Sequence, residues 1–164
     1  MKDNKINLLI VDDEEQFLNS IKKSLEVREF NVTAVNRGEK AIQVAREKPI
    51  DIALVDLKMP GIDGEETLKE LKKEHKWMEI VILTGHGSVN SAVECTKSGA
   101  YKYLQKPCEL DELLEALKDA YQKRVMNKNN IEEKKMKELL KISMSNSPRE
   151  IIRRLREIDR ENHN

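Results

Sequence analysis

Cysteine is nearly absent from this sequence, and long hydrophobic runs are missing. The 164 residues include two cysteines, Cys95 and Cys108, and neither belongs to a CxxC motif or to a cluster with histidines. A disulfide framework is therefore not indicated, and two free thiols in a reducing compartment are expected. No apolar stretch approaches the roughly 20 residues of a membrane-spanning helix. These absences predict a cytoplasmic protein without a membrane partner.

The sequence also lacks an excess of charge of either sign. Lys plus Arg and Asp plus Glu number 30 each, so the formal net charge is zero. Proteins that bind nucleic acid or membrane surfaces through overall charge carry a basic excess, and neither class is indicated here. The length predicts one domain with an appendage, because domains cluster around ~100–150 residues.

Strand-like apolar runs alternate with helix-like patterns through the first three quarters of the chain. This alternation is typical of an α/β fold in which helices cover both faces of a parallel sheet. It predicts a doubly wound domain over residues 1–124. The predicted strands are 6–11, 30–35, 51–56, 79–84 and 101–104, and the predicted helices are 15–28, 38–47, 64–75, 88–98 and 109–124.

Residues 125–164 show no strand-like pattern and are expected to form a helical C-terminal extension. Asn127, Asn129 and Asn130 predict a break after the helix that ends the first domain. Apolar residues from Ile131 onward, at helical spacing, then suggest a further helix.

A second helix of the extension is predicted to begin within Ser147-Pro148-Arg149-Glu150. Ser147 is a good N-cap, Pro148 suits the first helical position, and Glu150 completes a capping box. Arginines recur opposite the apolar face, which suggests an acidic partner, but interspersed glutamates favour a solvated surface. The apolar face is formed by Ile151, Ile152, Leu155 and Ile158, and the arginines are Arg149, Arg153, Arg156 and Arg160.

Polar side chains follow three of the predicted strands at the point where each strand ends. Asp12 and Asp13 follow the first strand, Asp56 ends the third, and Thr84 ends the fourth. The carboxyl ends of parallel strands meet at one edge, which is where open α/β sheets place their chemistry. Carboxylates at short range cannot all stay ionised unless a cation neutralises them. Oxygen ligands of this kind suit Mg²⁺, so a magnesium site is predicted.

A positive charge and two hydrogen-bond donors are expected at the same edge. Lys106 follows the fifth predicted strand, and the Thr84 hydroxyl stands beside the Gly85 amide. An ammonium, a hydroxyl, an amide and a metal ion together suit a phosphoryl group that is transferred to a carboxylate.

Five short motifs occur in order between about residues 5 and 124. They are Val11-Asp12-Asp13-Glu14, Asp56, Met59-Pro60-Gly61 with Asp63-Gly64, Thr84-Gly85-His86-Gly87-Ser88, and Gly99-Ala100-Tyr101 ahead of Lys106-Pro107. Together they resemble the response-regulator receiver domains of bacterial two-component signalling, and the fourth is similar to receivers of nitrogen-regulation-type activators. The resemblance implies a flavodoxin-like (βα)5 fold with strand order 2-1-3-4-5.

The resemblance also implies a role for each residue of the acidic edge. Asp56 is similar to the phosphoacceptor, which takes its phosphoryl group from the histidine of a partner kinase. Asp13, Asp56 and the backbone carbonyl of Lys58 resemble the direct Mg²⁺ ligands, and Asp12 resembles the residue that acts through metal-bound water.

A second group of residues resembles the family's switch. Thr84 matches the hydroxyl that turns toward the phosphoryl group, and Lys106 matches the ammonium that pairs with it. Tyr103 occupies the aromatic position that swings inward and repacks the surface of the fourth helix, fifth strand and fifth helix. A phosphoryl group brings about −1.5 to −2 of charge, which is enough to shift a balance between two states.

The resemblance implies a signalling protein and not an enzyme. Its expected partner is a sensor histidine kinase or a phosphotransfer protein. A homodimer through the fourth-helix, fifth-strand and fifth-helix surface or through the C-terminal helices is also expected. Residues 125–164 contain no helix-turn-helix, P-loop or GGDEF-like motif, so no DNA-binding domain is recognised there.

Two alternatives from other classes share parts of this pattern. A haloacid-dehalogenase-type phosphatase also forms an aspartyl-phosphate beside Mg²⁺, but its second aspartate is replaced here by Lys58. A flavodoxin-like electron carrier has the same topology, but the acidic Asp12-Asp13-Glu14-Glu15 would repel a cofactor phosphate after the first strand.

Overall fold

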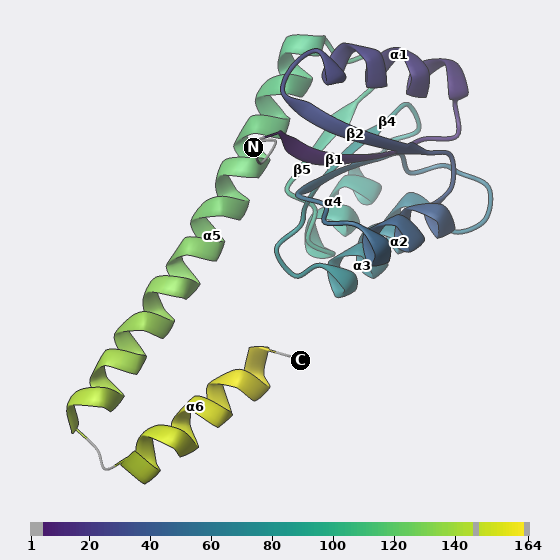
Figure 1. Cartoon of the computed structure of the whole chain (residues 1–164). Helices are drawn as coiled ribbons and strands as arrows, with labels where there is room; N and C mark the ends of the chain where they lie inside the picture. Colours follow the sequence, from purple (N-terminus) through teal and green to yellow (C-terminus); the bar gives the residue numbers. More distant parts are fainter. Residues whose placement is uncertain (1–4, 146–147, 163–164) are drawn as a thin grey trace. The chain divides into compact units, whose positions relative to one another are not determined.

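The computed structural model describes residues 5–145 and 148–162. Its central element is a parallel sheet with strand order β2-β1-β3-β4-β5, which confirms the predicted doubly wound α/β fold (Figure 1). Apart from α5, the predicted ends of the elements differ from the observed ones by at most two residues. The strands are β1 (Ile6–Val11), β2 (Phe30–Val35), β3 (Ile52–Val55), β4 (Glu79–Thr84) and β5 (Lys102–Gln105). The helices are α1 (Glu15–Glu26), α2 (Gly38–Glu47), α3 (Gly64–Glu74), α4 (Val89–Lys97), α5 (Leu110–Ser145) and α6 (Pro148–Asn162).

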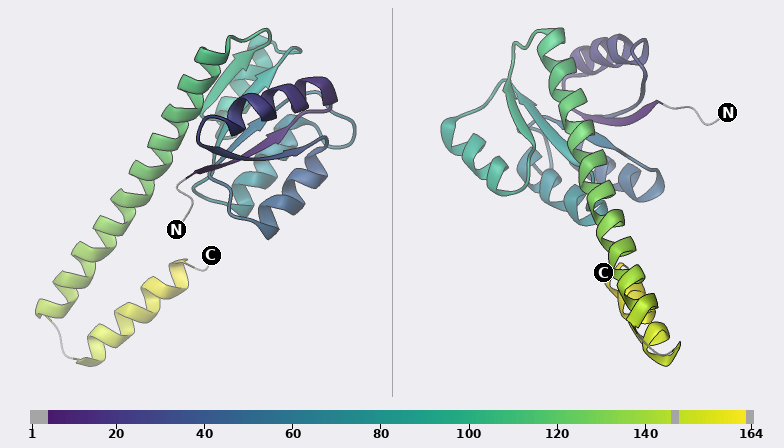
Figure 2. Two further views of the ribbon diagram at one scale, coloured as in Figure 1. Left: turned by 45° about the horizontal axis from the view of Figure 1, so that its top comes forward. Right: turned by 90° about the vertical axis from the view of Figure 1, so that its left-hand side faces the viewer.

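Each face of the sheet has its own hydrophobic core. Successive side chains of a strand point to opposite faces, so Leu8 and Ile10 belong to one core while Leu9 and Val11 belong to the other. α1 and the first turns of α5 cover the first face, and α2, α3 and α4 cover the second (Figure 2). Burial on both faces explains why the central strands are continuous apolar runs.

The register of the sheet aligns the carboxyl ends of its central strands. Val11 pairs with Val55, and Val55 pairs with Ile82 on the other side. Asp12 and Asp56 each come directly after a paired strand end. Their backbones are joined as well, because the Asp56 amide donates to the Val11 carbonyl at 2.9 Å. The sheet therefore fixes the separation of the two aspartates before their side chains make any contact.

Residues Leu110–Ser145 form one uninterrupted helix, so the predicted break at Asn127, Asn129 and Asn130 is wrong. Asparagine lowers helix propensity by less than ~1 kcal/mol per residue, whereas Gly and Pro are the strong breakers. The segment contains neither Gly nor Pro. An ion pair one turn apart, Lys137 to Glu133 at 2.7 Å, also supports the helix beyond the asparagines.

The chain divides into two compact units, Met1–Val125 and Met126–Asn164. Both cysteines lie in the first unit and are free thiols, Cys95 buried and Cys108 half-buried, as predicted. Among the described residues, none of the helices combines the length and the apolar character that crossing a membrane requires.

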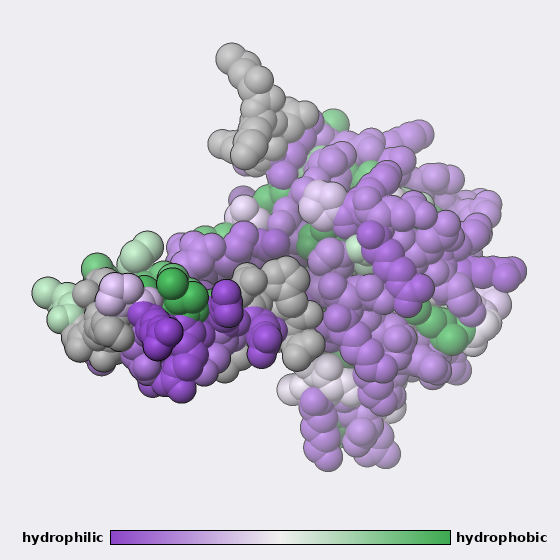
Figure 3. Space-filling view, turned by 60° about the horizontal axis from the view of Figure 1, so that its bottom comes forward, coloured by the Kyte–Doolittle hydropathy of each residue, from purple (hydrophilic) through white to green (hydrophobic). Residues whose placement is uncertain are grey.

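The second unit carries apolar side chains on its surface. α6 begins at Pro148 as predicted, while the predicted N-cap Ser147 and the side chain of Ile158 lie outside the described residues. Met144 is 88% exposed and Ile152 is 52% exposed. Figure 3 shows hydrophobic residues, in green, beside strongly hydrophilic ones on this unit.

Gly64 begins α3 against the backbone that carries Asp56. A Cβ at Gly64 would lie 2.1 Å from the Asp56 carbonyl oxygen and 2.6 Å from the Leu57 Cα, and neither atom belongs to a flexible side chain. We expect Gly64→Ala to lower the free energy of unfolding by about 1–3 kcal/mol, as overpacking does. Gly85→Ala is the matched control, because its nearest neighbour, the Lys106 Cβ, lies 3.9 Å away. Urea unfolding measures both, and equal stability of the two variants would contradict this account.

Candidate functional site

Three carboxylates meet at the carboxyl edge of the sheet. Asp12, Asp13 and Asp56 each offer an oxygen, and these oxygens lie within 4.8 Å of one another. Asp12 is 2% exposed and Asp56 is 3% exposed, whereas Asp13 is open to solvent. The structure thus brings together the three aspartates that the sequence placed at separate strand ends.

Local backbone geometry orients the two buried carboxylates. The Oδ1 atom of Asp56 accepts a hydrogen bond from the Leu57 amide at 2.9 Å. The Oδ1 atom of Asp12 accepts one from the Glu14 amide at 2.9 Å. These bonds hold the side chains beside the chain segments that follow β1 and β3, and the bond between Asp12 and the Glu14 amide has the spacing of an Asx turn.

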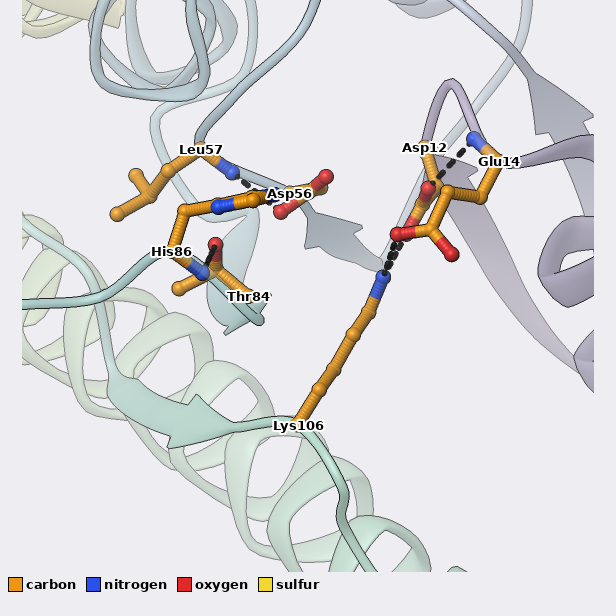
Figure 4. A network of polar contacts seen from close by, with 7 residues as sticks. All are labelled: Asp12, Glu14, Asp56, Leu57, Thr84, His86 and Lys106. Atoms are coloured by element: carbon orange, nitrogen blue, oxygen red, sulfur yellow. Dashed lines mark hydrogen bonds and ion pairs between the residues drawn. The ribbon is translucent and has the colours of Figure 1, made fainter.

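Lys106 brings a positive charge into the same cluster. Its Nζ lies 2.7 Å from Asp12 Oδ2 and 3.5 Å from Glu14 Oε1, as Figure 4 shows. The ammonium also lies 4.1 Å from the centre of the Phe17 ring on α1, a cation–π contact. The backbone of Lys106 is fixed to the end of β4, because its amide donates to the Thr84 carbonyl at 2.9 Å.

The pKa values of the Asp12 carboxyl and the Lys106 ammonium are both shifted upward. Burial raises the pKa of the Asp12 carboxyl, the bonds from Lys106 and Glu14 offset this only in part, and the charge of Asp56 raises it further. Burial lowers the pKa of the Lys106 ammonium. The hydrogen bond to Asp12 and the charges of Asp12, Asp56 and Glu14 outweigh that effect, so the net shift is upward. Burial is thus the first cause of the upward shift of Asp12, and the half-buried Lys106 ammonium offsets it only in part. The cluster sets three carboxylates against this ammonium, which leaves a net negative formal charge.

The donor set fits a hard divalent cation. Mg²⁺ binds oxygen ligands, needs few carboxylates and keeps several waters, and this cluster combines two buried carboxylates with an exposed one. An open depression of about 510 Å³ beside the cluster gives room for solvent, and both Asp13 and Lys58 line it. The predicted carbonyl ligand, Lys58, is thus at the mouth of the site.

Thr84 is fully buried at the end of β4, the strand that pairs with β3. Its Oγ1 accepts a hydrogen bond from the His86 amide at 3.1 Å (Figure 4). Gly85, between these two residues, is exposed. The hydroxyl is therefore held by the loop that joins β4 to α4.

Tyr103 lies in the middle of β5 and is half-buried. Its hydroxyl lies 2.9 Å from Ser91 Oγ on α4. It also fills the space beside Gly87, where a Cβ would lie 2.1 Å from the Tyr103 hydroxyl oxygen. The aromatic side chain thus contacts the loop after β4 and the first turn of α4, and it does not join the carboxylate cluster.

With this geometry established, comparison with known proteins identifies the family. The profile described as response regulator receiver domain matches residues 8–118. This chain belongs to the response regulator receiver family. The receiver is that of a two-component response regulator, and the phosphatase and flavodoxin alternatives are not favoured.

The receiver is similar to part of several known regulators. It is 35% identical over 130 residues to a putative response regulator NtrX-like of Rickettsia felis, covering 78% of this chain and 27% of that protein. It is 37% identical over 120 residues to the transcriptional regulatory protein ZraR of Klebsiella oxytoca, covering 73% of this chain and 27% of that protein. The chain thus spans about a quarter of the length of these curated relatives.

Solved receiver domains share its fold. A CheY-like receiver domain protein from Methanospirillum hungatei is 28% identical with a TM-score of 0.73, covering 75% of this chain and 98% of that one. A receiver domain from Clostridium thermocellum is 32% identical with a TM-score of 0.70, covering 74% of this chain and 98% of that one. The flavodoxin-like fold implied by the sequence motifs is confirmed.

Two residues next to the receiver site were not predicted from the sequence. Phe17 contacts the Lys106 ammonium, but it had only the signature of an apolar helix residue. Ser91 bonds Tyr103 and also belongs to the N-terminal cap of α4. The pattern Ser88-x-x-Ser91 before an apolar stretch was the available signal, and it departs from the usual capping box because Ser replaces Glu or Gln.

Mg²⁺ is expected to stabilise the folded receiver, because it relieves repulsion among carboxylates that are far apart in the unfolded chain. At a concentration ten times its Kd the gain is about 1.4 kcal/mol in the free energy of unfolding. Asp13→Asn should lose most of this gain, whereas Glu15→Gln, an exposed acid on α1, should keep it. Thermal unfolding with and without Mg²⁺ checks the comparison. A gain of the same size in wild type and Asp13→Asn is the result that counts against this site.

Proposed function

We propose that Asp56 accepts a phosphoryl group from a phosphohistidine and that the surrounding residues convert this event into a change of the receiver surface. One carboxylate oxygen of Asp56 attacks phosphorus, the phosphorus–nitrogen bond breaks, and the imidazole leaves with the electron pair. An acyl phosphate results. The observation that carries the proposal is the buried carboxylate of Asp56 beside Asp12 and Asp13, within 4.8 Å.

Hydrogen-bond donors of the chain near Asp56 suit the negative charge that develops on the phosphoryl group. Lys106 already bonds Asp12 at 2.7 Å, so its ammonium can pair with a phosphoryl oxygen through a short shift of a flexible side chain. The backbone amide of the exposed Gly85 and the hydroxyl of Thr84 are further donors at the end of β4. Donors placed in advance around a developing charge are the main source of stabilisation in such reactions.

Mg²⁺ is included in the proposal, with Asp13, Asp56 and the Lys58 carbonyl as direct ligands and Asp12 acting through water. When bound, it neutralises phosphoryl oxygens during transfer. The chain's own contribution is to hold Asp56 buried and oriented by the Leu57 amide, so that one carboxylate is presented in a defined direction.

The phosphoryl group is proposed to act on Thr84 as the first element of the switch. To turn toward a phosphoryl oxygen, the Thr84 hydroxyl must give up the hydrogen bond that its oxygen now accepts from the His86 amide at 3.1 Å. The loop between β4 and α4 then loses one of the hydrogen bonds that hold it. Tyr103 contacts Gly87 in that loop, so the environment of its side chain changes as well. The output is a shift between two populations, since a few hydrogen bonds distinguish them.

A histidine-bearing kinase or phosphotransfer protein is the proposed donor. An apolar groove of about 580 Å³ lies between α1 and the start of α5, lined among others by Phe17, Ile21 and Leu110, and Lys106 and Gly85 lie on its border. Apolar helix faces dock into such grooves. A donor helix seated there would bring a histidine next to the site.

The proposal also includes a cytoplasmic location, which the free thiols suit. It further includes self-association of the chain, through the α4-β5-α5 surface or through the C-terminal helices.

Phosphorylation of Asp56 is tested with a small donor. Acetyl phosphate with Mg²⁺ should add one phosphoryl group to the wild type, detected by mass spectrometry of the intact chain. Asp56→Asn should remain unmodified, while Asp111→Asn, in the first turn of α5, should be modified like the wild type. An unmodified wild type, or modification that persists in Asp56→Asn, would sink the proposal.

Thr84→Ala separates acceptance of the phosphoryl group from the response to it. Thr84 is proposed to respond to the phosphoryl group on Asp56 and not to accept that group itself. The variant should therefore still be phosphorylated. It should lose most of the change that phosphorylation causes in the amide chemical shifts of α4 and β5. Thr84→Ser keeps a hydroxyl and should restore the change. A full response in Thr84→Ala would show that the hydroxyl is not the reporter.

A further inference from the structure

We propose that Ser91 is a positioning residue of the switch, which joins the Tyr103 hydroxyl to the N-terminal turn of α4 in one hydrogen-bonded unit. The inference rests on the proposed function, since it specifies how the surface beyond Thr84 is regulated. The observation is a single atom, Ser91 Oγ, that lies 2.9 Å from the Tyr103 hydroxyl while also serving the capping box of α4.

Ser91 Oγ lies within hydrogen-bond distance of three atoms of Ser88 and of the Tyr103 hydroxyl, which is the contact that reaches another element. The atom accepts from the Ser88 amide at 2.8 Å and lies 2.9 Å from the Ser88 carbonyl, to which it can donate. A hydroxyl has one proton to donate and two lone pairs to accept with. The Tyr103 hydroxyl at 2.9 Å and the Ser88 hydroxyl at 3.2 Å both lie within reach of the second lone pair, and Tyr103 is the nearer of the two.

The reciprocal bond shows that this turn is a cap and not an isolated contact. The Ser91 amide donates to Ser88 Oγ at 3.1 Å, so Ser88 and Ser91 each satisfy the other's backbone N–H. The first amides of a helix have no partner within the helix. The side chain of Tyr103, from the neighbouring strand β5, is thereby linked to a backbone bond at the start of α4.

Steric contact ties the same side chain to the loop that Thr84 anchors. The Tyr103 hydroxyl occupies the space that a Cβ on Gly87 would need, and Gly87 lies between His86, bonded to Thr84, and Ser88. Loop movement that releases His86 therefore displaces the surface against which Tyr103 rests. If Tyr103 moves, Ser91 Oγ loses a hydrogen-bond partner and the cap of α4 weakens. Thr84, Tyr103 and α4 then respond together.

A double-mutant cycle tests this coupling without any phosphoryl donor. Exchange of the Ser88 amide hydrogen, measured by NMR, reports the bond to Ser91 Oγ. Tyr103→Phe and Ser91→Ala should each speed this exchange about 3- to 10-fold, the range expected for loss of one hydrogen bond. The double variant should exchange no faster than Ser91→Ala alone, because both changes break the same unit.

Matched variants separate positioning from ordinary capping. Ser91→Thr keeps the hydroxyl and should exchange within about twofold of the wild type, well inside the effect of one hydrogen bond. Thr96→Ala removes another α4 hydroxyl, one that bonds only the Ala92 carbonyl of its own helix, and should leave Ser88 exchange unchanged. Ser88 exchange that is unaltered by Tyr103→Phe, or single effects that multiply in the double variant, would overturn the proposal.

Beryllofluoride with Mg²⁺ then links the unit to the site. It should alter Ser88 exchange in the wild type and alter it less in Ser91→Ala, and an equal change in both proteins would contradict the coupling. Failure of the proposed function appears differently: the wild type then shows no Mg²⁺-dependent stabilisation by beryllofluoride. In that case the double-mutant cycle still tests the role of Ser91, because the wild type, the two single variants and the double variant are compared without any phosphoryl donor.

Discussion

Excess negative charge, held at the edge of a parallel sheet, is the constraint on which the rest of this receiver depends. Asp12 and Asp56 are buried behind strand ends that the sheet register fixes, and Lys106 offsets only part of their charge. Burial above all, and then the charge of Asp56, raises the pKa of the Asp12 carboxyl. A donor set of this kind suits a divalent cation, and the proposed function has Lys106 leave Asp12 for a phosphoryl oxygen.

In the proposed function, the loop from Thr84 to Ser88 converts events at that edge into events at the surface. One end of the loop is held by the Thr84 hydroxyl, and the other end is the cap of α4. Tyr103 contacts the loop from β5 and bonds Ser91. Because each contact is a single hydrogen bond or a close steric fit, the loop is secured by interactions of about 1 kcal/mol each. Such a loop can respond to one added phosphoryl group, whereas the two hydrophobic cores cannot.

Periodicity and strand-end chemistry were enough to predict the fold and the members of the acidic cluster. The runs ending at Val11 and Val55 were continuous and apolar, and parallel strands bring such ends together. The asparagines of α5 were misread as a break because local propensity is weak when neither Gly nor Pro is present. Ser91 escaped prediction because its bond to Tyr103 joins residues twelve positions apart on different elements. Such a pairing follows from side-chain packing, which no local pattern encodes.

The most direct test of the account is a crystal structure of the receiver with Mg²⁺ and beryllofluoride. The account predicts beryllium bonded to an Asp56 carboxylate oxygen, a metal ion contacted by Asp13 and Asp56, and Lys106 Nζ moved from Asp12 to a fluoride. An empty Asp56 with Lys106 still on Asp12, under conditions in which Mg²⁺ and beryllofluoride are saturating, would contradict it.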